Sequence, residues 1–355
     1  MNSKQALDRV IRKSRVHFYK PIQIAEILYR NRLSGLSLDS LDNYRTVSKR
    51  WRDEISLRIV GNVSTSSSRF QDNVFEDNAM PPELLKELGH FNKEHGGIVE
   101  AYIYLSMINK MNDLGEIHKY LTEAKDSGFN LEDLLKLFSG NSGLTRSMDK
   151  VYEIIAYSLF DAIISALDVH VSVKLETDNA AMIADFSGFT EKVIGIKEGV
   201  SLDASARVFR VGSTNANDGG LDLWANFGPA IQVKHFSITA NHLESITSGI
   251  KADKFIVVCT DADKQIIESV LKQSGTYPKV QSIVTLTDLR AWYSLATSDK
   301  YKDTVGVELL SSLLSEFEYE FPSNKEMPLF LTERGYDQIE LPGDWNPARA
   351  EVVDG

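Results

Sequence analysis

Gly212-Ser-Thr-Asn-Ala-Asn-Asp-Gly-Gly-Leu-Asp-Leu-Trp-Ala-Asn-Phe-Gly-Pro-Ala-Ile-Gln-Val-Lys-His-Phe236 is the stretch that decides the fold. Two short apolar runs flank the turn formers Asn226-Phe-Gly-Pro229, which predicts a hairpin with strands at 220–225 and 230–236. Because side chains alternate between the faces of a strand, Gln232 and Lys234 share one face, and the turn brings Asp222 near them. We therefore expect a carboxylate, an amide oxygen and an ammonium group at one place.

The segments around this hairpin extend it into a sheet flanked by helices. Further strands are predicted at 206–212, 254–260 and 280–286, with helices at 238–250 and 263–273 between the later strands. Strand–helix–strand alternation implies parallel pairing. A strongly apolar helix at 148–167 and an apolar-alternating segment at 169–175 come before the sheet. The predicted fold class is therefore α/β (α+β), a mixed sheet flanked by helices, after a mainly helical N-terminal region.

The expected cluster of side chains suits phosphodiester hydrolysis. Hard oxygen ligands such as the Asp222 carboxylate and the Gln232 amide oxygen suit Mg²⁺, which completes its coordination with water and substrate phosphate. A lysine such as Lys234 can position or deprotonate the attacking water and offset developing negative charge. The alternative is a structural salt bridge across the hairpin between Asp222 and Lys234.

Charge is distributed unevenly along the 355 residues. Residues 1–70 hold 14 Lys and Arg against 6 Asp and Glu, a balance of +8, and the remaining residues hold 25 against 44, a balance of −19. Such segregation suggests that the N-terminal end faces a polyanion. A basic face without a partner is the other interpretation.

The hairpin motif resembles a known nuclease pattern. Asp218-Gly-Gly-Leu-Asp222 followed by Ile231-Gln-Val-Lys234 resembles the PD-(D/E)XK nuclease motif in the Gln-x-Lys form of Mrr-like enzymes. The order helix, three strands, helix, strand agrees with the core of that family, which is the restriction-endonuclease-like fold. The sequence departs from the usual motif at Gln232, where a second acid is expected. Metal binding is therefore expected to depend on Asp222 and on another carboxylate.

That resemblance implies an acid on the helix before the core strands. Glu153 on the apolar helix is the candidate for a further metal ligand and catalytic residue, and Asp161 is the weaker alternative. Asp218 is expected to cap the Gly-Gly turn. His235 is expected to have no required role, since it lacks a partner at ligand spacing.

Over its whole length the chain also resembles type II restriction endonucleases of the HaeII type. The resemblance rests on the nuclease segment and on three N-terminal stretches: Lys4-Gln-Ala-Leu-Asp-Arg9, Val16-His-Phe-Tyr-Lys-Pro-Ile-Gln-Ile-Ala-Glu-Ile-Leu-Tyr-Arg30 and Ser48-Lys-Arg-Trp-Arg-Asp-Glu-Ile55. It implies Mg²⁺-dependent hydrolysis of double-stranded DNA at the palindrome purine-GCGC-pyrimidine. A palindromic target is matched by a two-fold protein, so a homodimer is expected.

Sequence-specific cleavage also needs residues that contact DNA. Helices predicted at 20–33 and 48–60 would form a helix-turn-helix-like pair, with Trp51, Ile55 and Ile59 on one face of the second. The candidate DNA-binding residues are Lys49, Arg50, Arg52 and Arg69. Arginine and lysine suit guanine edges in a G·C-rich site, but a basic helix can equally serve phosphate contacts alone.

The predicted organisation has four parts. These are a basic helical DNA-binding region at 1–78, a helical region at 79–147, the nuclease core at 148–300 and a C-terminal extension at 301–355. No apolar run is long enough for a membrane span and no secretory signal is visible, so we expect a cytoplasmic protein, and the resemblance to restriction endonucleases implies a prokaryotic one. The single Cys259 lies in an apolar run and is expected to be a buried structural thiol.

Two rival functions remain open at this stage. One is a nuclease with a different target, either a modification-dependent Mrr-like enzyme or a junction-resolving one. The other is a non-catalytic DNA-binding protein with a decayed nuclease fold, which Gln232 alone suggests. A zinc or histidine-metal nuclease is less consistent with the scattered histidines.

Overall fold

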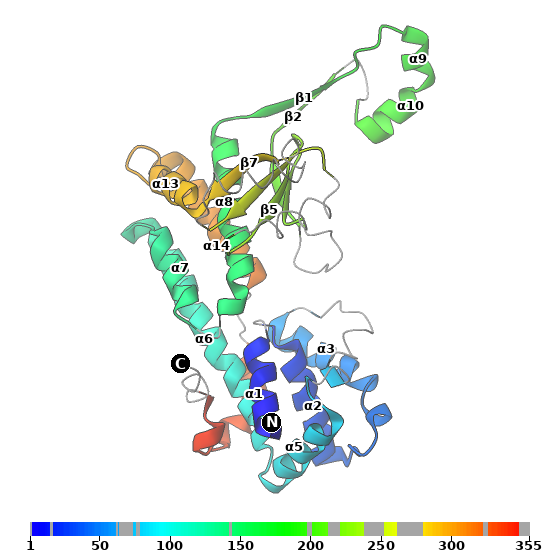
Figure 1. Ribbon diagram of the computed structural model, residues 1–355, viewed down its shortest axis with the longest axis vertical. Coiled ribbons are helices and arrows are strands. Elements are labelled where there is room, and N and C mark those ends of the chain that lie inside the picture. The colour runs from blue at the N-terminus through cyan, green and yellow to red at the C-terminus, as the bar shows by residue number, and fades with distance from the viewer. Residues whose placement is uncertain are drawn as a thin grey trace. The chain divides into compact units, whose positions relative to one another are not determined.

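Internal contacts divide the chain into two units (Figure 1). The first unit holds residues 1–151 and 314–355, and the second holds 152–313. The structure, a computed structural model, describes residues 2–14, 17–61, 63, 74–75, 79–141, 144–196, 201–211, 221–237, 252–260, 280–321 and 326–347. The regions 1–78 and 79–147 expected from the sequence both fall in the first unit, together with the end of the chain.

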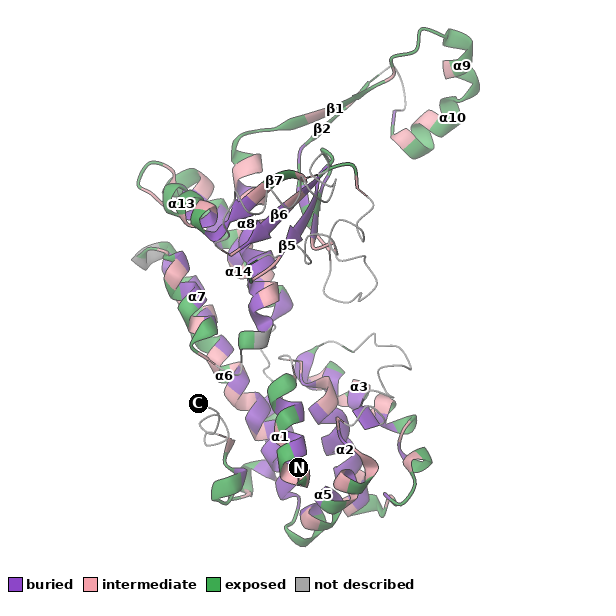
Figure 2. Cartoon of the chain, in the orientation of Figure 1, coloured by how far each residue is buried: buried purple, intermediate pink, exposed green. Residues whose placement is uncertain are grey.

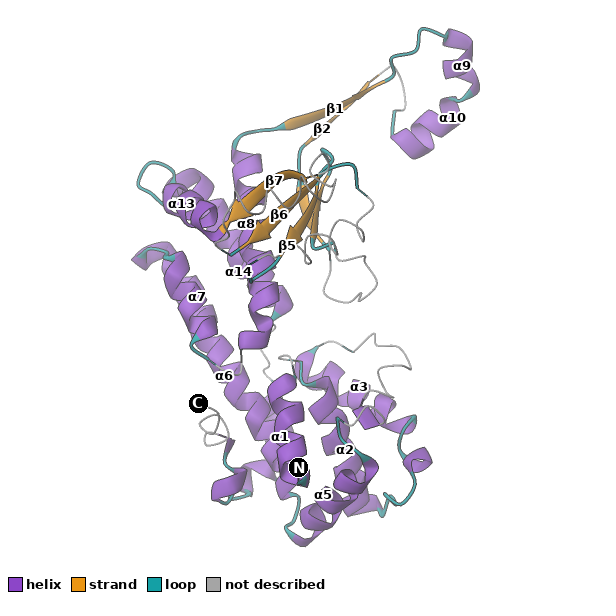
Figure 3. Cartoon of the chain, viewed as in Figure 1, coloured by secondary structure: helices purple, strands orange, loops and turns teal. Residues whose placement is uncertain are grey.

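The first unit is helical, in agreement with the sequence-based prediction (Figure 3). Its longer helices are α1 (Ser3–Lys13), α2 (Tyr19–Ser34), α3 (Val47–Val60), α5 (Pro82–Glu94), α6 (Ile98–Ser127), α7 (Leu131–Ser139) and α15 (Met327–Arg334). Short turns of 3₁₀ helix occur at η1 (Leu41–Asn43), η2 (Thr145–Ser147), η6 (Tyr336–Gln338) and η7 (Gly343–Trp345). The helices α8 (Met148–Ala166) and α14 (Val307–Glu320) each include the boundary between the units.

Helix α3 buries a different face from the one that its apolar residues predict. The fully buried residues are Ser48, Arg52, Ser56 and Ile59, whereas Trp51 and Ile55 are only partly buried. The small serine side chains let α3 approach α2 closely, and the Gln23 amide donates a hydrogen bond of 2.8 Å to the Ser48 hydroxyl. The exposed side of Trp51 is covered in part by the Arg30 guanidinium, 4.3 Å from the ring centroid.

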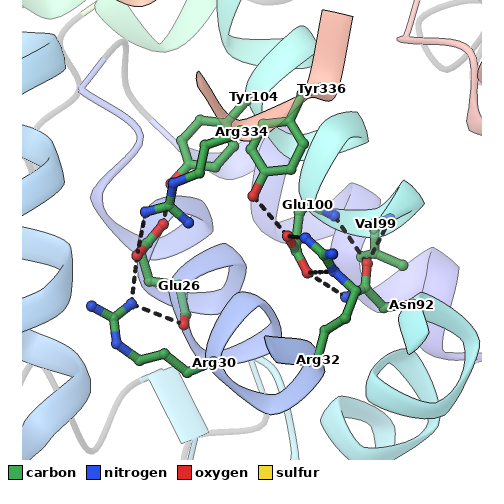
Figure 4. Close-up of polar contacts among 9 residues, drawn as sticks. All are labelled: Glu26, Arg30, Arg32, Asn92, Val99, Glu100, Tyr104, Arg334 and Tyr336. Atoms are coloured by element: carbon green, nitrogen blue, oxygen red, sulfur yellow. Dashed lines mark hydrogen bonds and ion pairs between the residues drawn. The ribbon is translucent and has the colours of Figure 1, made fainter. Parts of the chain in front are cut away.

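Two buried carboxylates fasten the C-terminal segment to the N-terminal helices (Figure 4). Glu26 accepts hydrogen bonds from Arg30 (2.6 Å), Tyr104 (2.9 Å) and Arg334 (3.4 Å). Glu100 accepts them from Arg32 (2.7 and 3.0 Å), Tyr336 (2.7 Å) and Asn92. Both glutamates are fully buried. Because a buried carboxylate is tolerated only when it is paired and hydrogen-bonded, residues 327–338 are an integral part of this unit.

The second unit is built around a five-stranded mixed sheet. Its strands are β3 (Val208–Arg210), β4 (Leu223–Ala225), β5 (Ala230–Val233), β6 (Phe255–Cys259) and β7 (Val280–Thr285), in that spatial order. The first three pair antiparallel, and β5, β6 and β7 pair parallel. The strands predicted from the sequence and their parallel pairing are therefore confirmed. The predicted helices 238–250 and 263–273 lie outside the described residues.

A helix and a free-standing ribbon complete the second unit. Helix α13 (Leu286–Ala296) follows β7 through a capping box, in which Thr285 and Asp288 bond each other. Strand β1 (His170–Lys174), predicted at 169–175, pairs with β2 (Ser201–Ser205) in a separate two-stranded sheet that is largely exposed (Figure 2). Between them lie α9 (Ala180–Asp185), α10 (Ser187–Phe189) and the π-helical turn η3 (Thr190–Ile194), and the π-helical turn η5 (Lys302–Gly306) comes after α13.

The described residues confirm a mixed helix-and-sheet class. Cys259 is a buried thiol, as predicted, and it lies in the small apolar cluster that Phe255, Val257 and Cys259 of β6 form with Ala230 of β5. No helix in the described part of the chain is both long and apolar enough to cross a membrane.

Candidate active site

The hairpin between β4 and β5 sets the position of the candidate site. Trp224 pairs with Ala230 across the hairpin, and the Ala225 amide donates a hydrogen bond of 3.1 Å to the Pro229 carbonyl. Gly228 in the turn has a φ of 122°, a conformation that favours glycine. This turn places Asp222, which comes directly before β4, beside the C-terminal end of β5.

Three groups converge on one oxygen of Asp222. The Val233 backbone N–H donates a hydrogen bond of 2.8 Å to Oδ2, and the Gln232 Nε2 donates one of 3.2 Å. The Lys234 Nζ lies 3.9 Å from the same oxygen. The side chains of Asp222 and Lys234 are 15% and 26% exposed, whereas Gln232 is 3% exposed. The site is therefore shielded on the sheet side and reachable by solvent at its rim.

The predicted cluster of Asp222, Gln232 and Lys234 is thus present in the structure. The sequence did not reveal the fourth member, the Val233 amide, because a backbone donor leaves no signature in residue type. This amide and the Lys234 ammonium hold the Asp222 carboxylate in one orientation. A carboxylate held in place beside an ammonium group is suited to both metal binding and activation of a water molecule.

The donor set fits Mg²⁺. Asp222 supplies a hard carboxylate oxygen, and a half-turn of the Gln232 terminal amide replaces Nε2 by Oε1 beside it. Within the described residues no group of three or more His, Cys, Asp and Glu side chains could hold a metal ion. The usual Mg²⁺ site has one or two carboxylates and completes its shell with water and phosphate oxygens, a pattern that Asp222 and a second acid could meet.

Helix α8 runs close to this end of β5. The ring of Tyr152 lies 6.4 Å from the ring of His235, the residue after Lys234. Glu153 is the next residue on α8 and is only 4% exposed. A buried glutamate on α8 is consistent with the acid expected on this helix, and its role as a metal ligand stays a prediction.

Asp161 lies two turns further along α8 in a different environment. Burial raises the pKa of its carboxyl above the usual range; nearby Arg207 lowers that pKa and Glu308 raises it further. These neighbours belong to the segment before β3 and to α14. Asp218 and the Gly-Gly turn lie outside the described residues.

The candidate DNA-binding residues on α3 differ in how far they reach solvent. Arg50 is 84% exposed and bonds Glu54 at 2.9 Å, and Lys49 is half-buried. Arg52 is fully buried, and its guanidinium bonds Asp53 at 2.9 and 2.6 Å. Because the Arg52 side chain is buried, it is not placed to contact DNA. Lys49 and Arg50 remain the candidate DNA-binding residues on this helix. Arg69 lies outside the described residues.

Comparison with known proteins places this geometry in a family. The family model described as HaeII restriction endonuclease matches residues 3–336. The chain belongs to the HaeII restriction endonuclease family. It is 43% identical over 340 residues to the type II restriction enzyme HaeII of Haemophilus aegyptius, covering 95% of this chain and 97% of that protein. It is 45% identical over 339 residues to the type II restriction enzyme NgoBI of Neisseria gonorrhoeae, covering 94% and 96%.

The predicted resemblance to the HaeII family is therefore confirmed over nearly the whole chain. No solved structure matches this chain. The family assignment covers both the first unit and the second, so the helical N-terminal unit belongs to the family as much as the sheet does.

Proposed function

We propose that this member of the HaeII family is a Mg²⁺-dependent type II endonuclease that hydrolyses phosphodiester bonds of double-stranded DNA. The observation that carries the proposal is the convergence of Gln232, Lys234 and the Val233 amide on the Asp222 carboxylate. The mixed sheet, with α8 beside β5, supports a restriction-endonuclease-like core of the PD-(D/E)XK type. The proposed target is purine-GCGC-pyrimidine, which rests on the family resemblance.

Hydrolysis adds a water oxygen to phosphorus and breaks one P–O ester bond. Neutral Lys234 would accept the proton of the attacking water and pass it on to the leaving oxygen through solvent. In its ammonium form Lys234 would instead donate a hydrogen bond to the water oxygen and stabilise the negative charge that develops on the phosphate. Asp222 and the Gln232 carbonyl oxygen would hold Mg²⁺, with Glu153 as a further acid. Bound Mg²⁺ would supply a positive charge that polarises the phosphate and neutralises the leaving oxygen. The Val233 amide keeps the Asp222 carboxylate oriented throughout.

The basic residues of the first unit would bind the DNA backbone and read the target. Lys49 and Arg50 on α3, together with Arg69, are the proposed contacts. A palindromic target implies two active sites related by a two-fold axis, so the working form would be a homodimer. Since phosphate contacts release counterions, binding should weaken steeply as salt increases.

Digestion of unmethylated plasmid and phage DNA with Mg²⁺, with EDTA as control and with the fragment ends sequenced, tests this function. Discrete fragments that end within purine-GCGC-pyrimidine are the expected result. Discrete ends elsewhere would keep the endonuclease and reject the specificity. Cleavage of modified DNA or of branched DNA alone would favour a modification-dependent or junction-resolving nuclease. DNA binding with no cleavage of any substrate would favour a decayed nuclease fold.

A further inference from the structure

A pair of exposed aromatic side chains lies on the same sheet as the candidate active site. Phe209 on β3 and Trp224 on β4 are register partners, and their rings stack with centroids 4.4 Å apart and planes 19° apart. Their exposed fractions are 36% and 43%. In contrast, the intervening residues of the same strands, Val208, Leu223 and Ala225, are at most 5% exposed and form the other, covered face.

The aromatic pair shares its face with the catalytic candidates. Trp224 pairs with Ala230, and Ala230 lies two residues before Gln232 on β5, so all three side chains project from one face. Gln232 bonds Asp222, which precedes Trp224 by two residues. Two residues of strand span about 7 Å. Because neighbouring phosphates of one DNA strand are about 3.4 Å apart along the helix axis, the pair lies within about two nucleotide steps of the candidate catalytic carboxylate.

We propose that Phe209 and Trp224 form a stacking surface for a nucleobase of the DNA strand whose phosphate lies at Asp222. This inference rests on the proposed function and adds a ligand subsite to it. Aromatic rings bind bases through their π-faces, which a base of a duplex exposes once it leaves the stack, so the surface would hold an unstacked base of this strand in position. Continuity with the active-site face favours a base over a protein partner, because a phosphate bound at Asp222 brings its own nucleotides to this surface.

A cross-strand aromatic pair can also serve only to stabilise a sheet. The experiment must therefore measure a quantity that looser packing alone would not change. The coupling between removing one base and replacing one aromatic side chain has this property, because the loss of a stacked base weakens binding only while its aromatic partner is present. A purely structural pair would change affinity for all duplexes alike.

The full-length protein is bound to a duplex containing purine-GCGC-pyrimidine, with Ca²⁺ in place of Mg²⁺, and a single abasic nucleotide is moved through the site and its flanks. The wild type is compared with Trp224→Leu, Phe209→Leu and the ring-retaining Trp224→Phe. The matched control is Trp292→Leu, since Trp292 is 38% exposed in the same unit on α13. Circular dichroism checks that each variant is folded.

Trp224→Leu and Phe209→Leu should each weaken binding to the intact duplex about tenfold, whereas Trp224→Phe and Trp292→Leu should bind like the wild type. At one nucleotide per strand the abasic substitution should weaken the wild type about tenfold and the leucine variants hardly at all. If the abasic nucleotide weakens binding by the same factor in the wild type and in the leucine variants at every position, the stacking proposal is overturned. Failure of the wild type to bind or cleave any duplex would reject the proposed function itself, and the subsite with it.

Discussion

Replacing Gln232 by glutamate restores the acid that the nuclease motif usually carries, and the structure sets the consequence. The Gln232 amide nitrogen lies 3.2 Å from Asp222 Oδ2, at a position that is 3% exposed. Two unit charges at this separation repel by about 5 kcal/mol at an effective dielectric constant of ~20. The Lys234 ammonium lies 3.9 Å from Oδ2 and offsets part of this repulsion, and partial protonation of the new carboxyl offsets more. The net loss in the free energy of unfolding is then on the order of 2–3 kcal/mol.

At pH 8 in EDTA, Gln232→Glu should therefore unfold at a temperature roughly 3–4 °C below that of the wild type. The repulsion raises the folded-state pKa of the new carboxyl. Its cost is consequently absent at low pH, where the group is protonated in both states, and grows as the pH rises through that pKa. Mg²⁺ should recover most of the loss, because a second carboxylate strengthens the metal site and ligand binding to the native state stabilises it.

Thermal unfolding followed by circular dichroism, with and without Mg²⁺, measures both effects. Gln281→Glu is the matched control, since it makes the same substitution at an exposed position of β7 in the same sheet. The control should unfold like the wild type in EDTA and should gain no extra stability from Mg²⁺. If Gln232→Glu is as stable as the wild type in EDTA, or if Mg²⁺ raises both transitions equally, then Gln232 does not adjoin Asp222 in a metal site.

Three further predictions follow from the described contacts. Arg50→Ala should weaken DNA binding by about 1–3 kcal/mol if Arg50 reads a base, with little effect on unfolding. Arg52→Ala should lower the free energy of unfolding by roughly 2–4 kcal/mol, because it removes a buried, paired charge. A DNA-binding assay and a urea titration of each variant separate the two effects. Tyr336→Phe should cost about 1.5–3 kcal/mol in urea unfolding, since it removes a hydrogen bond to the buried Glu100 carboxylate, and a cost near zero would contradict that contact. Because burial raises the folded pKa of Asp161, the stability of the wild type falls as the pH rises through that pKa. Asp161→Asn should therefore stabilise the protein at pH 7 by less than about 1 kcal/mol, and this gain should vanish below about pH 4. A gain in stability that stays constant across this pH range would contradict the assignment.

The sequence predicted the sheet and the candidate site because both depend on local patterns. Strand alternation and the turn at 226–229 are enough to bring Asp222, Gln232 and Lys234 together, and the structure places them within 3.9 Å of one carboxylate oxygen. The spacing between residues was therefore sufficient, without knowledge of the rest of the fold.

Long-range packing explains what the sequence could not predict. The face that α3 buries depends on its contact with α2, where two serines and a paired arginine replace the apolar stripe that the periodicity indicates. The C-terminal extension has no recognisable motif, yet Arg334 and Tyr336 bond carboxylates 308 and 236 positions earlier in the chain. The stacked pair Phe209 and Trp224 was likewise missed, because exposed aromatics in a strand look like ordinary core residues.

The central claim is that Asp222 and Lys234 cleave DNA, and comparing cleavage with binding for Asp222→Ala and Lys234→Ala tests it most directly. Rates of plasmid cleavage are measured with Mg²⁺, and affinity for the target duplex is measured with Ca²⁺. The Lys234 variant should lose at least about 10²–10³-fold in rate and the Asp222 variant more, because it removes the proposed metal ligand. Both should bind the duplex like the wild type. Cleavage at an unaltered rate by the Asp222 variant would contradict the account.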